Sequence, residues 1–209
     1  IVPVHLLASD QQGSTYMAMK RIVGFGWKNL LHPVTREQKE KAATMGLLDH
    51  LEILAKVCDA ISFAHSRNII HRDLKPENVM IGNFGEVLVM DWGLAVDVAD
   101  AVKSPQKLEH KSQAAALAGT PAYMAPEMAL GDHGNFGPAT DIYLLGAILY
   151  EIISGSPPHR GHKIMEIIGA AIKNQIAIDA GILSDRAVKE PLEIALKAMQ
   201  TAPQDRYRS

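Results

Sequence analysis

The segment IIHRDLKPENVMI, from Ile69 to Ile81, places a dense group of polar side chains between two short apolar runs. The group consists of His71, Arg72, Asp73, Lys75, Glu77 and Asn78. A buried strand tolerates such a density of charge only where the charges have partners or a chemical task. A second apolar run, VLVM, ends immediately before Asp91. Two apolar runs that each deliver acidic or amide groups at one end indicate a site for a cation and phosphates.

The composition is that of an ordinary globular protein. Of the 209 residues, 47% are hydrophobic and 21% are charged, and the formal net charge is −2. This near-neutral charge gives no support for nucleic acid as the main partner. The longest apolar run, IYLLGAILY, is too short to span a bilayer, so we expect no membrane segment within this chain.

The single cysteine, Cys58, excludes an internal disulfide and fits a reducing compartment, so we expect a cytoplasmic location. Cys58 lies in an apolar-periodic run, which predicts a buried, unreactive thiol. The chain opens on IVPVH without an initiator Met, and we interpret it as a fragment. One alternative is that it is the cytoplasmic part of a larger, membrane-attached protein.

Hydrophobic periodicity predicts a chain of the α+β class. Residues 1–8 and 14–23 are predicted to form two strands joined by the turn 9–13. Apolar residues then recur at helical spacing over 47–67, and residues 78–81 and 86–90 are predicted to form a hairpin. Further helices are expected at about 139–154, 163–173 and 186–199. This order does not alternate strands with helices, which argues against βαβ units.

Five motifs, in order, resemble those of the eukaryotic-like protein kinases in their bacterial serine/threonine form. They are HRDLKPEN (71–78), DWG (91–93), GTPAYMAPE (119–127), DIYLLG (141–146) and DRYRS (205–209). The first resembles the catalytic loop of the family, and the third resembles the end of its activation segment. The resemblance covers essentially the whole chain. It implies an α+β protein-kinase-like fold, with a mainly helical C-lobe at 24–209. Residues 1–23 would then be the end of the β-rich N-lobe and the hinge.

The resemblance also implies the roles of four residues in phosphoryl transfer from ATP. Asp73 is expected to act as the base for the attacking hydroxyl, and Lys75 to place an ammonium beside the γ-phosphate. Asn78 and Asp91 are expected to bind Mg²⁺ through an amide oxygen and a carboxylate, the hard oxygen ligands that this ion prefers. We therefore expect a kinase that uses ATP and Mg²⁺.

The expected acceptor class is a serine or threonine hydroxyl of a protein substrate. Lys75, two residues after Asp73, and Thr120 in GTP follow the serine/threonine pattern of the resembling family. Thr120 would bridge Asp73 and Lys75. The alternative is that Thr120 is a plain turn residue beside Pro121.

Other residues of the motifs are expected to serve the structure. In the resembling family, His71 packs in the core, while Arg72 often binds a phosphate on the activation segment. Glu127 and Arg206 would form a buried ion pair, and Asp141 would accept hydrogen bonds from the catalytic-loop backbone. Few side chains could carry a phosphate for Arg72 to bind, because the hydroxyls between Asp91 and Gly119 are those of Ser104 and Ser112.

The expected adenine site comes from the N-terminal strands. Lys20, in YMAMK, resembles the strand lysine of the family, but the chain advances only 53 residues from Lys20 to Asp73. That distance is too short for the helices and strands that separate the two groups in a kinase. We therefore interpret Met19 as the gatekeeper, the backbone of Lys20 and Ile22 as the adenine contact, and Met80 as the apolar floor. Lys75 would complete this nucleotide site.

The sequence lacks a glycine-rich phosphate loop, a strand lysine and its glutamate partner, so we expect residues 1–209 alone to be inactive. Two other functions are alternatives to that of a protein kinase. A non-catalytic pseudokinase or scaffold would not need the intact set of Asp73, Lys75, Asn78 and Asp91. A small-molecule phosphotransferase should lack GTPAYMAPE and Arg206.

Overall fold

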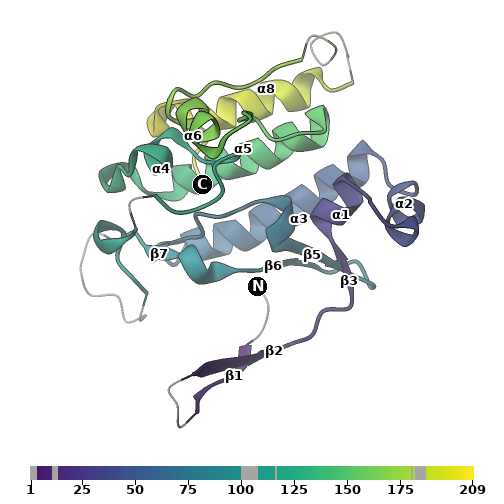
Figure 1. Cartoon of the computed structure of the whole chain (residues 1–209), viewed down its shortest axis with the longest axis horizontal. Coiled ribbons are helices and arrows are strands. Elements are labelled where there is room, and N and C mark those ends of the chain that lie inside the picture. The colour runs from purple at the N-terminus through teal and green to yellow at the C-terminus, as the bar shows by residue number, and fades with distance from the viewer. Residues whose placement is uncertain (1–3, 11–13, 100–107, 116, 180, 182–186) are drawn as a thin grey trace.

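The computed structural model describes residues 4–10, 14–99, 108–115, 117–179, 181 and 187–209. These residues form small antiparallel sheets and a larger set of helices (Figure 1). The architecture is α+β and mostly helical, which confirms the expected fold class.

The first sheet is the hairpin of β1 (Val4–Ser9) and β2 (Thr15–Met19). It lies apart from the helical body in Figure 1, and the exposed side chains of Leu6, Tyr16 and Met19 show that it has little cover. Both predicted strands are therefore confirmed, although the second ends at Met19. Residues 1–3 and 11–13 of the predicted strand and turn lie outside the described residues.

Two further sheets frame the segment from Ile69 to Asp91. In one, β3 (Gly24–Gly26) pairs with β5 (Val79–Gly82), and β5 pairs with β6 (Val87–Val89), which confirms the predicted hairpin. In the other, β4 (Ile69–Ile70) pairs with β7 (Val96–Asp97). The β3–β5 pairing depends on glycine, because a Cβ on Gly24 would lie 2.0 Å from the carbonyl oxygen of Ile81.

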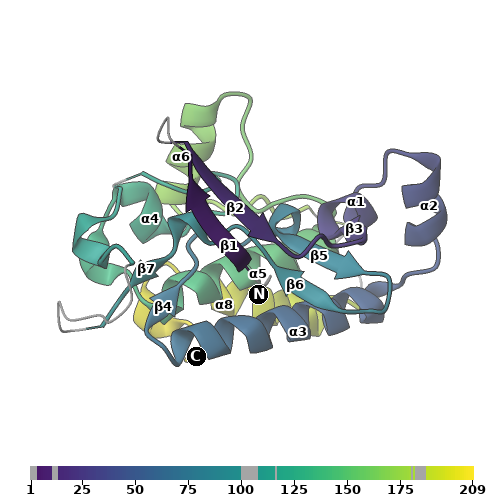
Figure 2. The ribbon, with the colours of Figure 1, turned by 90° about the horizontal axis from the view of Figure 1, so that it is seen from below.

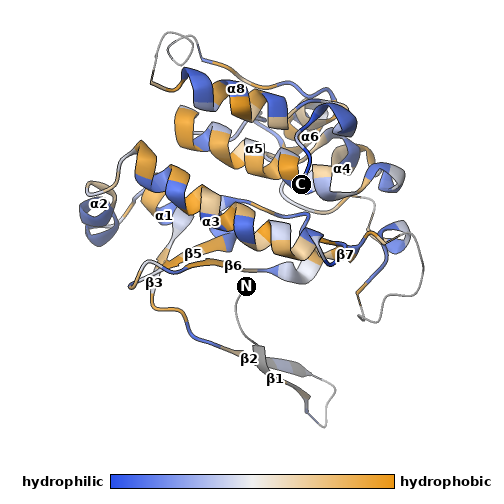
Figure 3. Cartoon of the chain, turned by 180° about the vertical axis from the view of Figure 1, so that it is seen from behind, coloured by the Kyte–Doolittle hydropathy of each residue, from blue (hydrophilic) through white to orange (hydrophobic). Residues whose placement is uncertain are grey.

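The core of the helical body lies around α5 (Pro138–Ser154), which packs between α3 (Leu47–His65) and α8 (Lys189–Ala198) (Figure 3). Residues 143–151 of α5 are buried on every face, as expected for a helix enclosed by protein. Helix α3 has one buried stripe and carries β6 against it (Figure 2). These helices match the predicted ranges 47–67, 139–154 and 186–199 to within three residues at each end.

Close packing of α5 on α8 requires a small residue at the contact. A Cβ on Gly146 would lie 2.7 Å from the Cβ of Ala198, closer than side chains approach without a shift. Gly146 and Ala198 therefore set the spacing of the two helices, since interior packing leaves no room for an added methyl group.

The remaining helices are short. They are α1 (Trp27–Leu31), α2 (Arg36–Ala42), α4 (Pro126–Leu130) and α6 (Ile164–Ile172), and α6 was predicted at 163–173. Short 3₁₀ turns lie at Pro76–Asn78, Trp92–Leu94, Lys111–Gln113, His133–Asn135 and Pro203–Asp205.

The sequence did not predict β3, β4, β7, α1, α2 or α4. Helix α2 buries no residue, so it has no hydrophobic period to detect; a capping box between Thr35 and Gln38 begins it instead. The prediction of a buried Cys58 is also wrong, because this residue is exposed. Cys58 lies at the margin of the buried stripe of α3 that Leu54, Val57 and Ile61 form.

None of the helices in the described part of the chain is long and apolar enough to cross a membrane.

Candidate active site

The catalytic loop is attached to the N-terminal turn of α5 by one buried carboxylate. Oδ2 of Asp141 accepts a hydrogen bond from the backbone N–H of His71 at 2.8 Å, and Oδ1 accepts one from the N–H of Arg72 at 2.9 Å. Nε2 of His65 lies 2.9 Å from the same Oδ2. Arg72 has a φ of 68°, so Asp141 holds a left-handed backbone residue directly before Asp73. The expected role of Asp141 is confirmed.

Four predicted side chains meet in one hydrogen-bonded cluster. The Thr120 hydroxyl donates to Oδ1 of Asp73 at 2.8 Å and accepts from Nζ of Lys75 at 2.6 Å. Nζ of Lys75 also lies 3.0 Å from Oδ2 of Asp73. Nδ2 of Asn78 donates to Oδ2 of Asp73 at 3.1 Å and to its backbone oxygen at 2.7 Å. Thr120 therefore bridges Asp73 and Lys75, across 45 residues of chain, and is more than a turn residue.

His71 connects the catalytic loop to the DWG loop. Its ring is fully buried, with Nε2 2.9 Å from the carbonyl oxygen of Met90 and Nδ1 accepting from the N–H of Asp73 at 3.2 Å. These partners fit a neutral imidazole protonated on Nε2. The His71 and Trp92 rings pack with centroids 4.6 Å apart. The prediction that His71 packs in the core is confirmed.

Asp91 stands at the end of β6 in the left-handed region, with a φ of 56°. Its neighbour Met90 donates its N–H to the carbonyl oxygen of Asn78 at 2.8 Å, so the two predicted metal ligands lie beside the adjoining ends of β5 and β6. Asp91 is exposed, and among the described residues no side chain pairs with its carboxylate. Asn78 commits its amide nitrogen to Asp73, which leaves its amide oxygen for a cation.

This donor set fits Mg²⁺, because a carboxylate and an amide oxygen are hard ligands and substrate phosphates usually complete the shell. The described residues contain no group of three His, Cys, Asp or Glu side chains that would hold a metal ion alone. A cation between Asn78 and Asp91 would therefore need ligands from the nucleotide.

Arg72 is a buried cation without a carboxylate partner among the described residues. Its Nη atoms donate to the carbonyl oxygens of Leu94 (3.5 Å) and Ala115 (3.2 Å), its guanidinium lies 4.7 Å above the Phe136 ring, and Nε has no partner. Burial lowers the pKa of Arg72. Ser112, one of the two serines that could carry this phosphate, is exposed, and its Oγ lies 2.8 Å from Nδ1 of His110. The other, Ser104, is outside the described residues. Phosphate binding by Arg72 stays a prediction.

The predicted ion pair of Glu127 and Arg206 is present and bidentate. Nη1 and Nη2 of Arg206 donate to the two carboxylate oxygens at 2.7 and 2.8 Å. The guanidinium also donates to the carbonyl oxygens of Gln200, Ala139 and Thr201, so all five of its N–H groups have acceptors. This pair fixes the end of the activation segment to the C-terminal segment.

The predicted adenine contacts lie outside the hydrogen-bonded cluster. Met19 ends β2 and is 44% exposed, Lys20 is exposed and Ile22 is half-buried in the link to β3. Met80 is half-buried on β5, opposite Gly26. The structure thus brings together side chains that were predicted for phosphoryl transfer, while their catalytic roles and the adenine contacts stay predictions.

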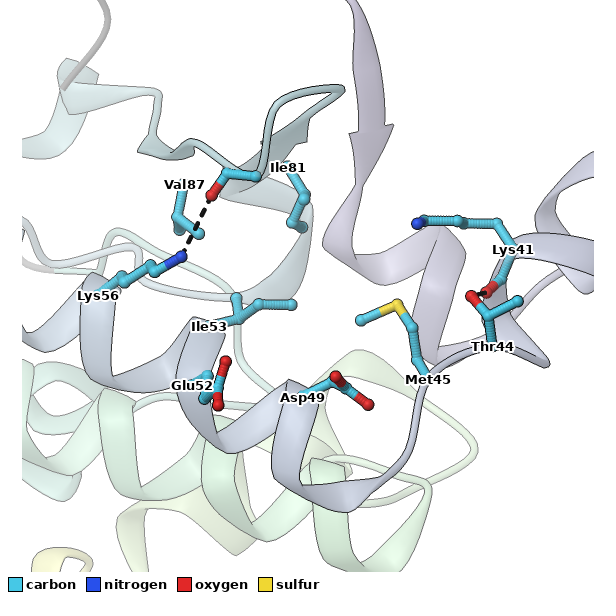
Figure 4. Close-up of a pocket in the computed structure, with 10 residues that line it drawn as sticks. Lys41, Thr44, Met45, Asp49, Glu52, Ile53, Lys56, Ile81 and Val87 are labelled. Carbon is cyan, nitrogen blue, oxygen red and sulfur yellow. Dashed lines mark hydrogen bonds between the residues drawn. The ribbon is translucent and has the colours of Figure 1, made fainter.

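A separate groove of about 210 Å³ lies between α3 and the β5–β6 hairpin (Figure 4). Met45, Ile53, Ile81 and Val87 give it an apolar lining, and Lys56 crosses its edge to the carbonyl oxygen of Gly85 at 3.2 Å. None of the predicted site residues lines this groove, so it is not part of the phosphoryl-transfer site.

Sequence reasoning missed a polar cluster beside the site. Glu151, near the C-terminal end of α5, is buried, and its carboxylate contacts Lys28 of α1, His32 directly after α1, and the Tyr123 hydroxyl. The available signal was a single carboxylate, Glu151, within the apolar run LLGAILYEII.

The fold and this site together define a protein kinase domain. The family model for the protein kinase domain matches residues 8–206, and the chain belongs to that family. It is 34% identical to the serine/threonine-protein kinase PknD of Chlamydia caviae over 222 residues, which cover 100% of this chain and 23% of the relative. The identity to PknD of Chlamydia trachomatis is 33% over 230 residues, covering 100% and 24%.

The chain therefore spans about a quarter of the length of the curated relatives it matches. These matches confirm the predicted resemblance to bacterial serine/threonine kinases. Members of this family use ATP and Mg²⁺ and act on proteins.

Proposed function

We propose that this chain is the catalytic part of a protein-serine/threonine kinase, which transfers the γ-phosphate of ATP to serine or threonine hydroxyls of proteins. In this proposal Asp73 is the base, Lys75 pairs with the γ-phosphate, and Asn78 with Asp91 holds Mg²⁺. Residues 1–23 would be the end of the N-lobe and the hinge, and residues 24–209 the C-lobe.

The observation that carries the proposal is the position of Thr120 between Asp73 and Lys75. The distances of 2.8 and 2.6 Å bring a carboxylate, an ammonium group and a hydroxyl from two segments of the chain into contact. A pseudokinase or scaffold has no need of this arrangement. The same bond also keeps the Asp73 carboxylate in a fixed orientation, and phosphoryl transfer depends mainly on positioning.

The chemistry follows from these groups. The acceptor oxygen forms a bond to the γ-phosphorus, the bond from that phosphorus to the β–γ bridging oxygen breaks, and ADP leaves. Asp73 receives the proton of the acceptor hydroxyl. The Lys75 ammonium balances negative charge on the transferring group. Mg²⁺, when bound, neutralises charge on the phosphates, and Asn78 and Asp91 are the residues that would hold it.

We also propose that the adenine ring lies against Met80 and meets the backbone of Lys20 and Ile22, with Met19 as the gatekeeper. Chain order supports this assignment for Met19, Lys20 and Ile22, since they precede the catalytic loop as a hinge would, whereas Met80 follows that loop on β5.

The test uses the full-length protein, ATP and Mg²⁺ with three peptides that differ only in carrying serine, threonine or tyrosine as the acceptor. We expect transfer to serine and threonine and little to tyrosine. Thr120→Val, which removes the hydroxyl and keeps the shape, should lower kcat by up to about 10²-fold, because the base loses its positioning contact. The matched control Thr120→Ser keeps the hydroxyl and should stay near the wild-type rate.

Predominant phosphotyrosine would overturn the acceptor assignment. Normal ATP binding without phosphate transfer to any peptide would favour the alternative that this protein is a non-catalytic pseudokinase or scaffold.

A further inference from the structure

Glu151 is a buried carboxylate that the proposed reaction does not use. It is 1% exposed. Its Oε1 accepts a hydrogen bond from Nζ of Lys28 at 2.7 Å and lies 2.8 Å from Nε2 of His32, and its Oε2 accepts from the Tyr123 hydroxyl at 2.5 Å. All three partners are side chains from other parts of the chain, so Glu151 joins α5 to α1 and to the activation segment.

The Tyr123 contact leads directly to the acceptor site. The N–H of Tyr123 donates to the carbonyl oxygen of Thr120 at 3.0 Å, which closes a turn from Thr120 to Tyr123. Thr120 begins this turn and contacts Asp73. Tyr123 is buried, so its ring and hydroxyl fix one end of the turn whose other end carries the bridging hydroxyl.

The hydrogen bond from Tyr123 runs in one direction. Burial and the neighbouring Glu151 carboxylate raise the pKa of the Tyr123 hydroxyl far above its usual range, so this group stays protonated and donates. Glu151 must then be an acceptor, a role that both a carboxylate and an amide oxygen can fill.

The carboxylate form of Glu151 needs a cation, because an isolated buried charge is costly. Lys28 supplies it, and its Nζ also lies 3.6 Å from Oε1 of Glu77 in the catalytic loop. His32 is the second neighbour of the carboxylate. Glu151 of α5 therefore contacts α1 and the end of the activation segment, and Lys28 extends this cluster to Glu77 in the catalytic loop.

We propose that Glu151 is a positioning residue, which acts through Tyr123 to hold the Thr120 turn against Asp73, and that Lys28 keeps it in place as its counter-charge. This inference deepens the proposed function and rests on it for its catalytic consequence. It assigns a part in acceptor transfer to α1, an element that carries none of the predicted site residues.

A charge-balanced rescue tests the proposal in the full-length protein. Lys28→Met leaves the Glu151 carboxylate without its cation, loosens the Tyr123 contact and should lower kcat for the peptide acceptor by about tenfold. The double variant Lys28→Met/Glu151→Gln restores a neutral acceptor for Tyr123 that needs no cation, and should recover most of the wild-type kcat. Lys28→Arg, the conservative variant, should stay near wild type.

Two readouts separate positioning from general damage. The Kd for ATP should be unchanged in Lys28→Met, because Thr120 belongs to the acceptor side. Hydrogen–deuterium exchange of backbone amides in residues 119–124 should speed up in Lys28→Met and return toward wild type in the double variant. Tyr123→Phe removes the hydroxyl while Lys28 is not substituted, and it should speed the same exchange. The matched control is Lys39→Met, on the exposed face of α2.

The inference is overturned if Lys28→Met and Tyr123→Phe leave both kcat and exchange at 119–124 unchanged, or if Glu151→Gln fails to rescue Lys28→Met. Hydrogen–deuterium exchange of the backbone amides can be measured whether or not the protein transfers phosphate. If the wild-type protein transfers no phosphate but the exchange pattern follows expectation, the proposed function falls and the positioning contact stands.

Discussion

Replacing Arg206 should destabilise this protein more than replacing any exposed arginine. The Arg206 and Glu127 side chains are 0% and 4% exposed, and their two parallel N–H to oxygen contacts are 2.7 and 2.8 Å long. Arg206→Met removes both contacts and leaves the Glu127 carboxylate buried without its cation. Loss of one partner from such a pair costs about 3–5 kcal/mol of unfolding free energy. For a chain of this length, that corresponds to a fall of roughly 6–20 °C in Tm.

The structure also ranks the related variants. Glu127→Gln leaves the Arg206 guanidinium with three carbonyl acceptors, from Gln200, Ala139 and Thr201, so it should cost less, about 1.5–3 kcal/mol. The double variant Arg206→Met/Glu127→Gln no longer buries an unpaired charge. Its cost should fall short of the sum of the single costs by about 1–3 kcal/mol, as contacting residues show in such cycles.

The assay is urea unfolding followed by circular dichroism, with unfolding free energies taken at 25 °C for all variants. The matched control is Arg36→Met, which removes an ion pair of similar length, 2.7 Å to Glu40, whose side chains are 92% and 64% exposed. Exposed pairs of this kind contribute less than about 0.5 kcal/mol. Equal losses for Arg206→Met and Arg36→Met would refute the reasoning from burial, as would strict additivity in the double variant.

Three further predictions concern the proposed reaction. Asp73→Asn should lower kcat by about 10²–10⁴ while ATP binding persists, because the amide cannot accept the acceptor proton; turnover within a factor of a few in steady-state kinetics would remove Asp73 as the base. Asp91→Ala should abolish the Mg²⁺-dependent part of the thermal shift caused by ATP, since it removes the anionic ligand, and an unchanged shift would contradict the metal assignment. Residues 1–209 alone should transfer no measurable phosphate in a radiolabelled-ATP assay beside the full-length protein, because they contain no glycine-rich phosphate loop; comparable rates would show that the loop is dispensable or that Lys20 does the work of the strand lysine.

The catalytic cluster was predictable because most of it is local. Asp73, Lys75 and Asn78 lie within six residues, so a motif carries both their identity and their approximate geometry. Thr120 comes from a second motif, and its contact with Asp73 followed from the family resemblance. The long helices α3 and α5 were predicted because buried residues recur along them at helical spacing.

The parts that were missed depend on tertiary contacts or on capping. The residues around Glu151 come from separate parts of the sequence, with Lys28 and His32 near one end and Tyr123 in between. They share no motif, so the sequence does not show that they meet. Helix α2 begins at a capping box and buries nothing, which leaves periodicity without a signal. Cys58 lies at the edge of the stripe on α3, where a helical period cannot separate buried from exposed positions.

The packing of Trp92 on His71 gives this protein an intrinsic optical reporter. The chain has two tryptophans, and Trp27 is fully buried, with Nε1 donating to Nδ1 of His50 at 3.0 Å. Trp92 instead follows Asp91 directly and is half-buried. Within residues 1–209, Trp27→Phe leaves Trp92 as the remaining tryptophan. In that variant of residues 1–209, occupation of the neighbouring carboxylate by a cation and nucleotide could be followed in real time through Trp92 emission, without an added dye.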